Sequence, residues 1–212
     1  MQTEKGQSIE DESMKIIENE IGSHHYDKHE WPIVRRVIHA TADFDFARDN
    51  KIIFHKNAIS SGIQALRNGC NIIVDVDGVL GGLNKKNLKD FSNKTICNIS
   101  NQDLFELAKK QNKTRSQVAM RMAAKEMNGS VVVVGNAPTA LFEVISMIKE
   151  RLARPALVIG VPVGFVSSPE SKEVLQTIDV PYITNKGRKG GSPCASAIVN
   201  ALFNLIREEL SS

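Results

Sequence analysis

The chain alternates between short apolar runs and stretches with apolar residues at helical spacing. The runs predict strands at residues 51–55, 71–78, 94–99, 130–134, 155–160 and 181–186. The helical spacing predicts helices at residues 9–21, 32–41, 57–68, 102–111 and 115–128, and after Pro138, Pro169 and Ser192. We expect Ser192 to be the N-cap of the last helix and the glycine-rich residues 78–84 to form a loop or a loose helical turn.

Repeated strand, turn and helix indicate an α/β fold. We expect a mostly parallel sheet with helices on both faces, forming a single three-layer domain over residues 1–212. Residues 1–8 are polar and lie outside the first helical pattern, so we expect them to be a mobile tip.

Composition restricts the class of protein. Hydrophobic residues make up 42% and charged residues 24% of the chain, a mix typical of globular domains. A net charge of +3, without an arginine-rich stripe or a series of aromatic residues, gives no support to nucleic-acid binding. The longest apolar run, residues 156–166, is too short to span a membrane. Scattered Cys70, Cys97 and Cys194 favour reduced thiols, and we expect a soluble cytoplasmic protein.

Residues 35–47, RRVIHATADFDFA, contain the most suggestive titratable group. His39 falls near the C-terminal end of a predicted helix, where the helix dipole favours a protonated ring. The pattern fits a proton donor, and it also fits a half-buried structural histidine. Asp43 and Asp45 follow, either to adjust the pKa of the ring or to cap the helix end. His24, His25 and His29 fit a polar loop better than a metal site.

Several glycine-containing turns follow predicted strands, where ligands bind in parallel α/β folds. Two of these turns lead into helix N-termini, which favour anions. The turn GRKGG adds Lys186, Arg188 and Lys189, so it predicts either a pocket for a ligand with several negative groups or a flexible basic loop. Neither a dinucleotide fingerprint nor a P-loop is present, and the sequence contains no nucleophile elbow or metal-ligand cluster.

Five motifs occur together and in order: RRVIHATADFDFA, TRSQVAM, GNAPTALF, VPVGFVSSPESK and GRKGGSPCASA. From about Ser13 to the last helix, the chain resembles the precorrin-8X methylmutase family, also called cobalt-precorrin-8 methylmutase. The resemblance implies an isomerase of cobalamin biosynthesis that moves a methyl group from C-11 to C-12 on ring C of a contracted tetrapyrrole, giving (cobalt-)cobyrinic acid. It also implies a polycarboxylate substrate, a homodimer, no cofactor and no metal site, since any cobalt belongs to the substrate.

The resemblance also implies roles for individual residues. The R-x-x-H-A motif places the family's catalytic histidine, a general acid, at His39. The family's substrate-binding serine and arginine match Ser13 and Arg115. By looser matching, the substrate-binding set extends to Thr41, Asn136, Thr139, Arg188, Gly190, Gly191 and Ser192.

The sequence departs from the family at DVDGVLGGL, where Gly78 replaces a larger side chain, so the wall of the pocket differs there. The ATADFD segment resembles the cobalt-dependent, anaerobic branch. Two other functions remain open. One is a non-catalytic corrinoid carrier with the same pocket. The other is a nucleotide-binding oxidoreductase, which the α/β pattern and GRKGG alone suggest.

Overall fold

The computed structural model describes residues 3–49 and 51–211. Its centre is a six-stranded sheet of order β1-β6-β5-β4-β2-β3. β1 pairs antiparallel with β6, and every other pair is parallel, which confirms the predicted mostly parallel sheet. The strands are β1 (Ile52–Phe54), β2 (Ile72–Val74), β3 (Thr95–Ile96), β4 (Val131–Val134), β5 (Leu157–Gly160) and β6 (Tyr182–Asn185).

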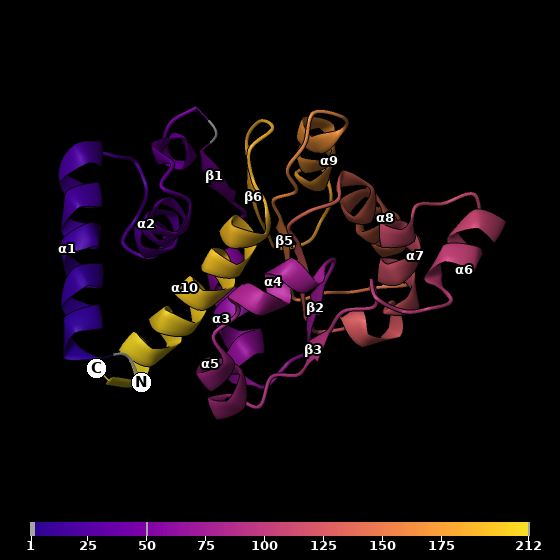
Figure 1. Ribbon diagram of the computed structural model, residues 1–212, viewed down its shortest axis with the longest axis horizontal. Coiled ribbons are helices and arrows are strands. Elements are labelled where there is room, and N and C mark those ends of the chain that lie inside the picture. Colours follow the sequence, from indigo (N-terminus) through magenta and orange to yellow (C-terminus); the bar gives the residue numbers. More distant parts are fainter. Residues whose placement is uncertain (1–2, 50, 212) are drawn as a thin grey trace.

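Helices cover both faces of the sheet, so the predicted three-layer arrangement is confirmed (Figure 1). One face carries α2 (Glu30–Thr41), α3 (Ala58–Arg67), α4 (Asp77–Gly82) and α10 (Ser192–Ser211), with α1 (Glu4–Ile21) packed on α2 and with α5 (Lys85–Asp90) beside α4. The other face carries α7 (Arg115–Met122), α8 (Pro138–Lys149) and α9 (Ser168–Leu175), with α6 (Leu104–Lys110) packed on α7. Short 3-10 helices complete the chain at η1 (Phe44–Ala47) and η2 (Lys125–Met127).

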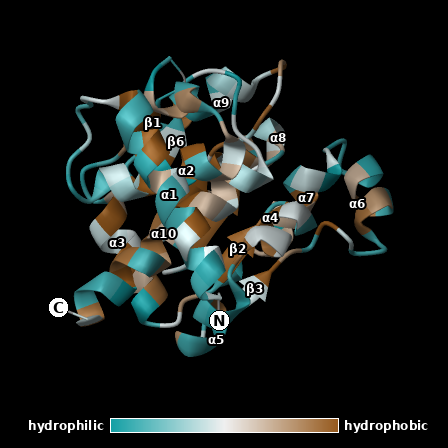
Figure 2. Cartoon of the chain, turned by 60° about the vertical axis from the view of Figure 1, so that its left-hand side comes forward, coloured by the Kyte–Doolittle hydropathy of each residue, from teal (hydrophilic) through white to brown (hydrophobic). Residues whose placement is uncertain are grey.

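The four valines of β4 show how the sequence builds these layers. Successive side chains of a strand point to opposite faces, and here Val131 and Val133 join one core while Val132 and Val134 join the other. All four are buried, as expected for a strand covered on both sides. Figure 2 shows hydrophobic residues, in brown, at the central strand β2 and hydrophilic residues, in teal, on the outlying helix α5.

Several observed elements differ from the prediction. The helix α5 was not predicted, and α7 ends at Met122, six residues before the predicted end at residue 128. α1 begins at Glu4, five residues before the predicted start, because Thr3 Oγ1 accepts a hydrogen bond from Gly6 N and caps it. The glycine-rich stretch after β2 is the helix α4, which lies directly against α10. Ser192 is the first residue of α10 and not its N-cap. None of the described helices is long and apolar enough to cross a membrane.

Candidate functional site

His39 and Ser13 form a hydrogen-bonded pair between α2 and α1. Ser13 Oγ lies 2.8 Å from His39 Nδ1, and both residues are partly buried. The two residues are 26 positions apart, and they meet because α1 packs along α2. The contact occupies one ring nitrogen and leaves Nε2 without a hydrogen bond to any residue that the structure describes. His39 is therefore oriented by a hydroxyl group and keeps one nitrogen for a ligand.

A cavity of about 330 Å³ adjoins His39. Its lining comes from three helices: α2 contributes Arg36, His39 and Ala40, α4 contributes Gly78 and Gly82, and α10 contributes Ser192, Pro193, Ser196, Ala197 and Asn200. α4 lies where the sequence predicted a loop or a loose helical turn, and it is a regular helix of six residues.

The glycines of α4 allow this wall to form. A Cβ at Gly78 would lie 3.0 Å from Ser192 Oγ, and a Cβ at Gly82 would overlap Ser196 Oγ. α4 and α10 can approach closely only because these positions lack side chains. Gly78, the position that departs from the family pattern, therefore lies in the wall of the His39 cavity.

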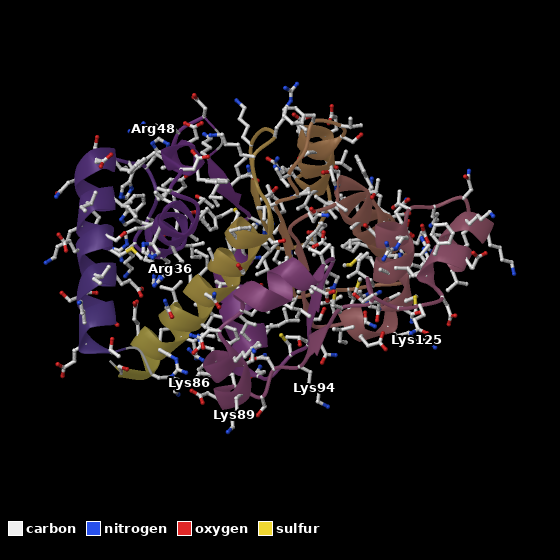
Figure 3. All side chains as sticks on the ribbon, viewed as in Figure 1. Arg36, Arg48, Lys86, Lys89, Lys94 and Lys125 are labelled. Atoms are coloured by element: carbon white, nitrogen blue, oxygen red, sulfur yellow. The ribbon has the colours of Figure 1, made fainter. Side chains whose placement is uncertain are left out.

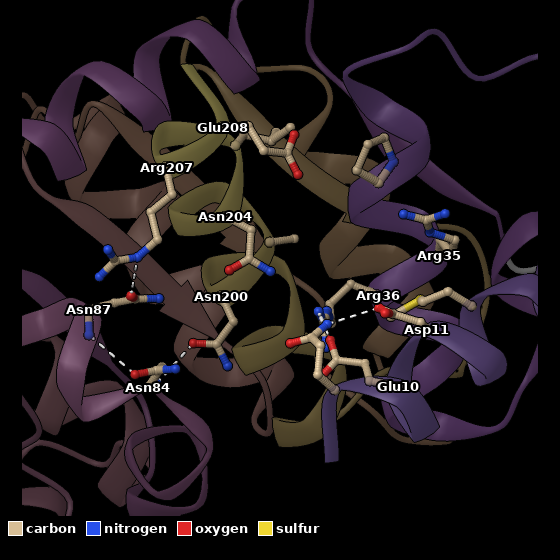
Figure 4. A pocket seen from close by; sticks show the side chains of 15 residues that line it. Glu10, Asp11, Arg35, Arg36, Asn84, Asn87, Asn200, Asn204, Arg207 and Glu208 are labelled. Atoms are coloured by element: carbon tan, nitrogen blue, oxygen red, sulfur yellow. Dashed lines mark hydrogen bonds and ion pairs between the residues drawn. The ribbon is translucent and has the colours of Figure 1, made fainter. Parts of the chain in front are cut away.

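A second cavity, of about 490 Å³, shares Arg36 and Asn200 with the first and continues along α1, α2 and α10 (Figure 4). Arg36 lies between α1 and α10 and forms an ion pair with Glu10 (Figure 3). Asn200 Oδ1 accepts a hydrogen bond from Asn84 N at 2.9 Å, and Asn200 Nδ2 donates to Gly82 O at 2.8 Å. The junction between the cavities thus carries one anchored guanidinium and one anchored amide.

The predicted residues Asn136, Thr139 and Arg115 form a second group. The fully buried carboxylate of Asp75 accepts hydrogen bonds from Gly135 N, Asn136 N and Ala137 N at 2.8–2.9 Å and fixes the turn before α8. Burial raises the pKa of Asp75, and these backbone donors oppose that rise.

The same group continues through the start of α7. Thr139 Oγ1 lies 3.1 Å from Thr114 Oγ1, and Arg115 Nη2 donates to Ile99 O at 2.9 Å. A Cβ at Gly135 would lie 3.2 Å from Ser192 Cα, so the turn before α8 adjoins the start of α10 and the His39 cavity. The predicted residues therefore form a band along the carboxyl ends of the parallel strands rather than one tight cluster.

The loop 186–191 reaches the segment that follows His39. Lys189 Nζ lies 2.7 Å from Asp43 Oδ2 and 2.6 Å from Asp45 Oδ2, and these hydrogen bonds raise the pKa of Lys189. The carboxylates whose role the sequence left open therefore bind the loop, and they neutralise one of its three cations.

The remaining predicted residues have clear positions. Arg188 is exposed, with its guanidinium 5.7 Å from the centre of the Phe165 ring. Gly190 has φ 155°, and a Cβ there would overlap Val161 O, so only glycine fits. Gly191 N donates to Val161 O at 2.9 Å, and Thr41 Oγ1 donates to Val37 O at 2.8 Å within its own helix.

Sequence reasoning missed the site positions of Arg36, Asn200 and the buried Lys172. Arg36 had a usable signal, because it precedes His39 by three residues and so shares its helix face. Asn200 and Lys172 had none, because their environments depend on packing between distant segments. Among the described residues, no group of three or more His, Cys, Asp or Glu side chains could hold a metal ion.

The chain is an α/β protein with a mostly parallel sheet. At the carboxyl ends of its strands, an imidazole held by a hydrogen bond lies beside a cavity, so the site can bind an anion and transfer a proton. The family model "Precorrin-8X methylmutase" matches residues 8–205. The chain belongs to the precorrin-8X methylmutase family, as its five motifs suggested.

Individual relatives agree along almost the whole chain. The "Cobalt-precorrin-8 methylmutase" of Leptospira interrogans is 47% identical, covering 96% of this chain and 95% of that protein. The protein of the same name from Priestia megaterium is 46% identical, covering 94% and 88%. A solved structure described as precorrin-8x methyl mutase from Thermus thermophilus has a TM-score of 0.88 at 38% identity, covering 96% of this chain and 98% of that one.

Proposed function

We propose that this chain is a cobalt-precorrin-8 methylmutase, an isomerase of cobalamin biosynthesis. It moves a methyl group from C-11 to C-12 on ring C of the macrocycle and yields cobyrinic acid. The Ser13–His39 pair beside its cavity carries this proposal, because it supplies an oriented acid within a chain that belongs to the methylmutase family.

His39 acts as a general acid through Nε2. In the protonated ring, Nδ1–H donates to Ser13 Oγ and Nε2–H is left for the substrate. After the transfer, the neutral ring keeps its proton on Nδ1, so Nε2 can take the transferred proton back. The proton moves to the macrocycle near ring C, polarises the conjugated system while the methyl group migrates, and then returns to Nε2. A positioned acid of this kind contributes about 10²–10⁴ in rate.

The polar groups around His39 hold the carboxylates at the edge of the macrocycle. Arg36 lines the cavity directly, one helical turn before His39, and a guanidinium binds a carboxylate with two parallel hydrogen bonds. Ser192 lines the same cavity, and we assign it substrate contact. We also propose that the outer parts of the substrate are contacted by residues farther from His39, which are Thr41, Arg115, Asn136, Thr139, Arg188, Gly190 and Gly191. Fixing the ring so that the methyl group faces its new carbon supplies much of the remaining rate enhancement.

We propose cobalt-precorrin-8 as the substrate rather than its metal-free counterpart. The Leptospira interrogans and Priestia megaterium relatives both carry the cobalt name. The reaction needs no redox cofactor, since an isomerisation leaves atoms and electrons balanced. Comparing kcat/KM for the two substrates tests the metal preference, and a higher value for the metal-free form would contradict it.

We further propose a homodimer. Phe165 and Val166 are 85% and 82% exposed, and they belong to the loop that contacts loop 186–191 through Gly164 N. A second copy that covers these side chains would remove apolar surface from water beside the site. Light scattering after gel filtration should give twice the chain mass of 23.3 kDa. A monomer at micromolar concentration would refute the dimer.

We also propose a cytoplasmic location, supported by the free thiols of Cys70, Cys97 and Cys194. Alkylation of the thiols in freshly lysed source cells should modify them without prior reduction once the protein is denatured. Recovery of a disulfide from those cells would contradict this location.

Turnover tests the proposed function. Purified protein is mixed with a large excess of cobalt-precorrin-8, and cobyrinic acid is followed by its visible spectrum and by chromatography. Many equivalents of product per active site are expected. Conversion that stops at one equivalent, or no conversion, would favour a corrinoid-binding protein instead.

A further inference from the structure

A fully buried lysine lies beneath the loop 186–191. Lys172 of α9 is 1% exposed, and its Nζ donates hydrogen bonds to Gly187 O at 2.9 Å and to Lys189 O at 2.6 Å. Burial lowers the pKa of Lys172 to about 8. A buried ammonium is expensive unless hydrogen bonds satisfy it, and here the satisfying groups are carbonyls of the loop.

Other donors hold the neighbouring carbonyls, one from strand β6 and one from the loop that contains Gly164. Asn185 Nδ2 donates to Lys186 O at 2.9 Å and to Lys189 O at 2.8 Å. Gly164 N donates to Arg188 O at 3.1 Å. Four consecutive carbonyls, from residue 186 to residue 189, are thus bound by donors of the surrounding protein.

This arrangement determines where the N–H groups of the loop point. In a planar trans peptide, the C=O of one residue and the N–H of the next point in opposite directions. The N–H groups of residues 187–190 therefore turn away from the donors that hold the carbonyls. None of the four donates a hydrogen bond to any residue within 3–49 and 51–211. Successive N–H groups that face one way form an anion-binding concavity.

The loop lies beside the proposed catalytic site. Its last residue, Gly191, leads directly into Ser192 and Pro193, which line the His39 cavity. The side chain of Lys189 fixes it to Asp43 and Asp45, just after the helix that carries His39. Lys172 binds the carbonyls of this loop and the two aspartates bind the side chain of Lys189, so both sets of contacts fix the position of the loop.

We propose that the N–H groups of residues 187–190 bind one peripheral carboxylate of the macrocycle, and that Lys172 and Asn185 are the positioning residues that orient them. The choice of ligand rests on the proposed function. A row of N–H donors favours an ionised carboxylate over its ester, because the carboxylate carries a negative charge on two strong acceptor oxygens and hydrogen bonds to an ionised acceptor are about twice as strong as neutral ones. The Lys172 ammonium behind the carbonyls adds to the same preference, so the subsite distinguishes the acid from its ester.

The direct experiment uses the wild-type protein labelled with ¹⁵N. Cobyrinic acid in its diamagnetic cobalt(III) form should shift the amide resonances of residues 187–190, and its fully methyl-esterified form should not. Unchanged amide resonances with bound acid, or equal shifts with the ester, would overturn the proposal. This comparison needs no catalysis, so it can fail or succeed whether or not the wild-type protein turns over.

Variants test the positioning role. Lys172→Met and Asn185→Ala should each raise KM and the dissociation constant of cobyrinic acid about tenfold, which corresponds to about 1.4 kcal/mol. kcat should stay within about twofold, and binding of the ester should not change. Thr184→Val is the matched control. Thr184 is next to Asn185 on β6, and its substitution removes a buried hydrogen bond to Gly160 O that does not involve the loop.

Two results would refute this role. One is an unchanged KM in folded Lys172→Met and Asn185→Ala proteins. The other is a loss of kcat with unchanged affinity for the acid. If Lys172→Met does not fold, Asn185→Ala and the wild-type amide shifts still decide the matter.

Discussion

Replacing Gly78 by alanine tests whether the missing side chain shapes the His39 cavity. A Cβ at residue 78 would lie 3.0 Å from Ser192 Oγ, tighter than an ordinary contact. A Cβ at Gly81, on the same helix, would meet nothing within 4 Å. Both substitutions reduce the freedom of the unfolded chain equally, so Gly81→Ala is the matched control.

The structure sets different magnitudes for the two variants. Gly81→Ala should raise the free energy of unfolding by about 0.4–1 kcal/mol, because alanine lowers the conformational entropy of the unfolded chain. In Gly78→Ala, crowding against Ser192 should offset that gain by about 1 kcal/mol or more. The added methyl also enters a cavity of about 330 Å³, and one surplus carbon in a fitted pocket should raise KM about tenfold.

Urea unfolding and steady-state kinetics measure these effects. In the Gly78→Ala background, Ser192→Ala should restore most of the lost stability, because it removes the crowded hydroxyl. Equal unfolding free energies and equal KM values for Gly78→Ala and Gly81→Ala would refute the assignment of Gly78 to the cavity wall.

Three further predictions follow from other contacts. Ser13→Ala should lower kcat about tenfold by releasing the His39 ring, and the exposed Ser8→Ala on the same helix should not; equal rates would contradict the pairing. Asp75→Ala should lower the free energy of unfolding by about 3 kcal/mol in urea titrations, because it leaves the N–H groups of Gly135, Asn136 and Ala137 without their acceptor. Asp75→Asn should lower it by less, and a smaller effect of alanine than of asparagine would contradict this reasoning. Lys172 has a folded pKa of about 8 against 10.5 in the unfolded chain, so the unfolded state binds more protons above pH 8 and stability rises with pH. From pH 7 to pH 9, wild type should gain about 1 kcal/mol relative to Lys172→Met, and a constant difference would argue against a buried ammonium.

The fold was largely predictable because its signals are local. Four successive valines predict a strand buried on both sides, and Pro138 opens α8 as expected. α4 was ambiguous for a physical reason: its glycines are selected by contact with α10, and that contact is invisible in a short sequence window. The N-terminal start of α1 was placed late because its first turns carry few apolar residues.

The sequence gives candidate residues for the site, but it does not give the contacts between them. His39 and Ser13 were identified through family motifs, but their hydrogen bond depends on the packing of two helices. Lys189 contacts Asp43 across 146 positions, and Lys172 is buried beneath the loop 186–191, whose carbonyls it binds. Such contacts arise from tertiary packing, which no local pattern contains.

We propose that His39 transfers the proton that permits methyl migration. Single-turnover and steady-state rates of His39→Ala with cobalt-precorrin-8, together with its affinity for cobyrinic acid, test it most directly. We expect kcat to fall by a factor of about 10²–10⁴, while the affinity for the product stays within about threefold of wild type. A variant that keeps the wild-type kcat would contradict it.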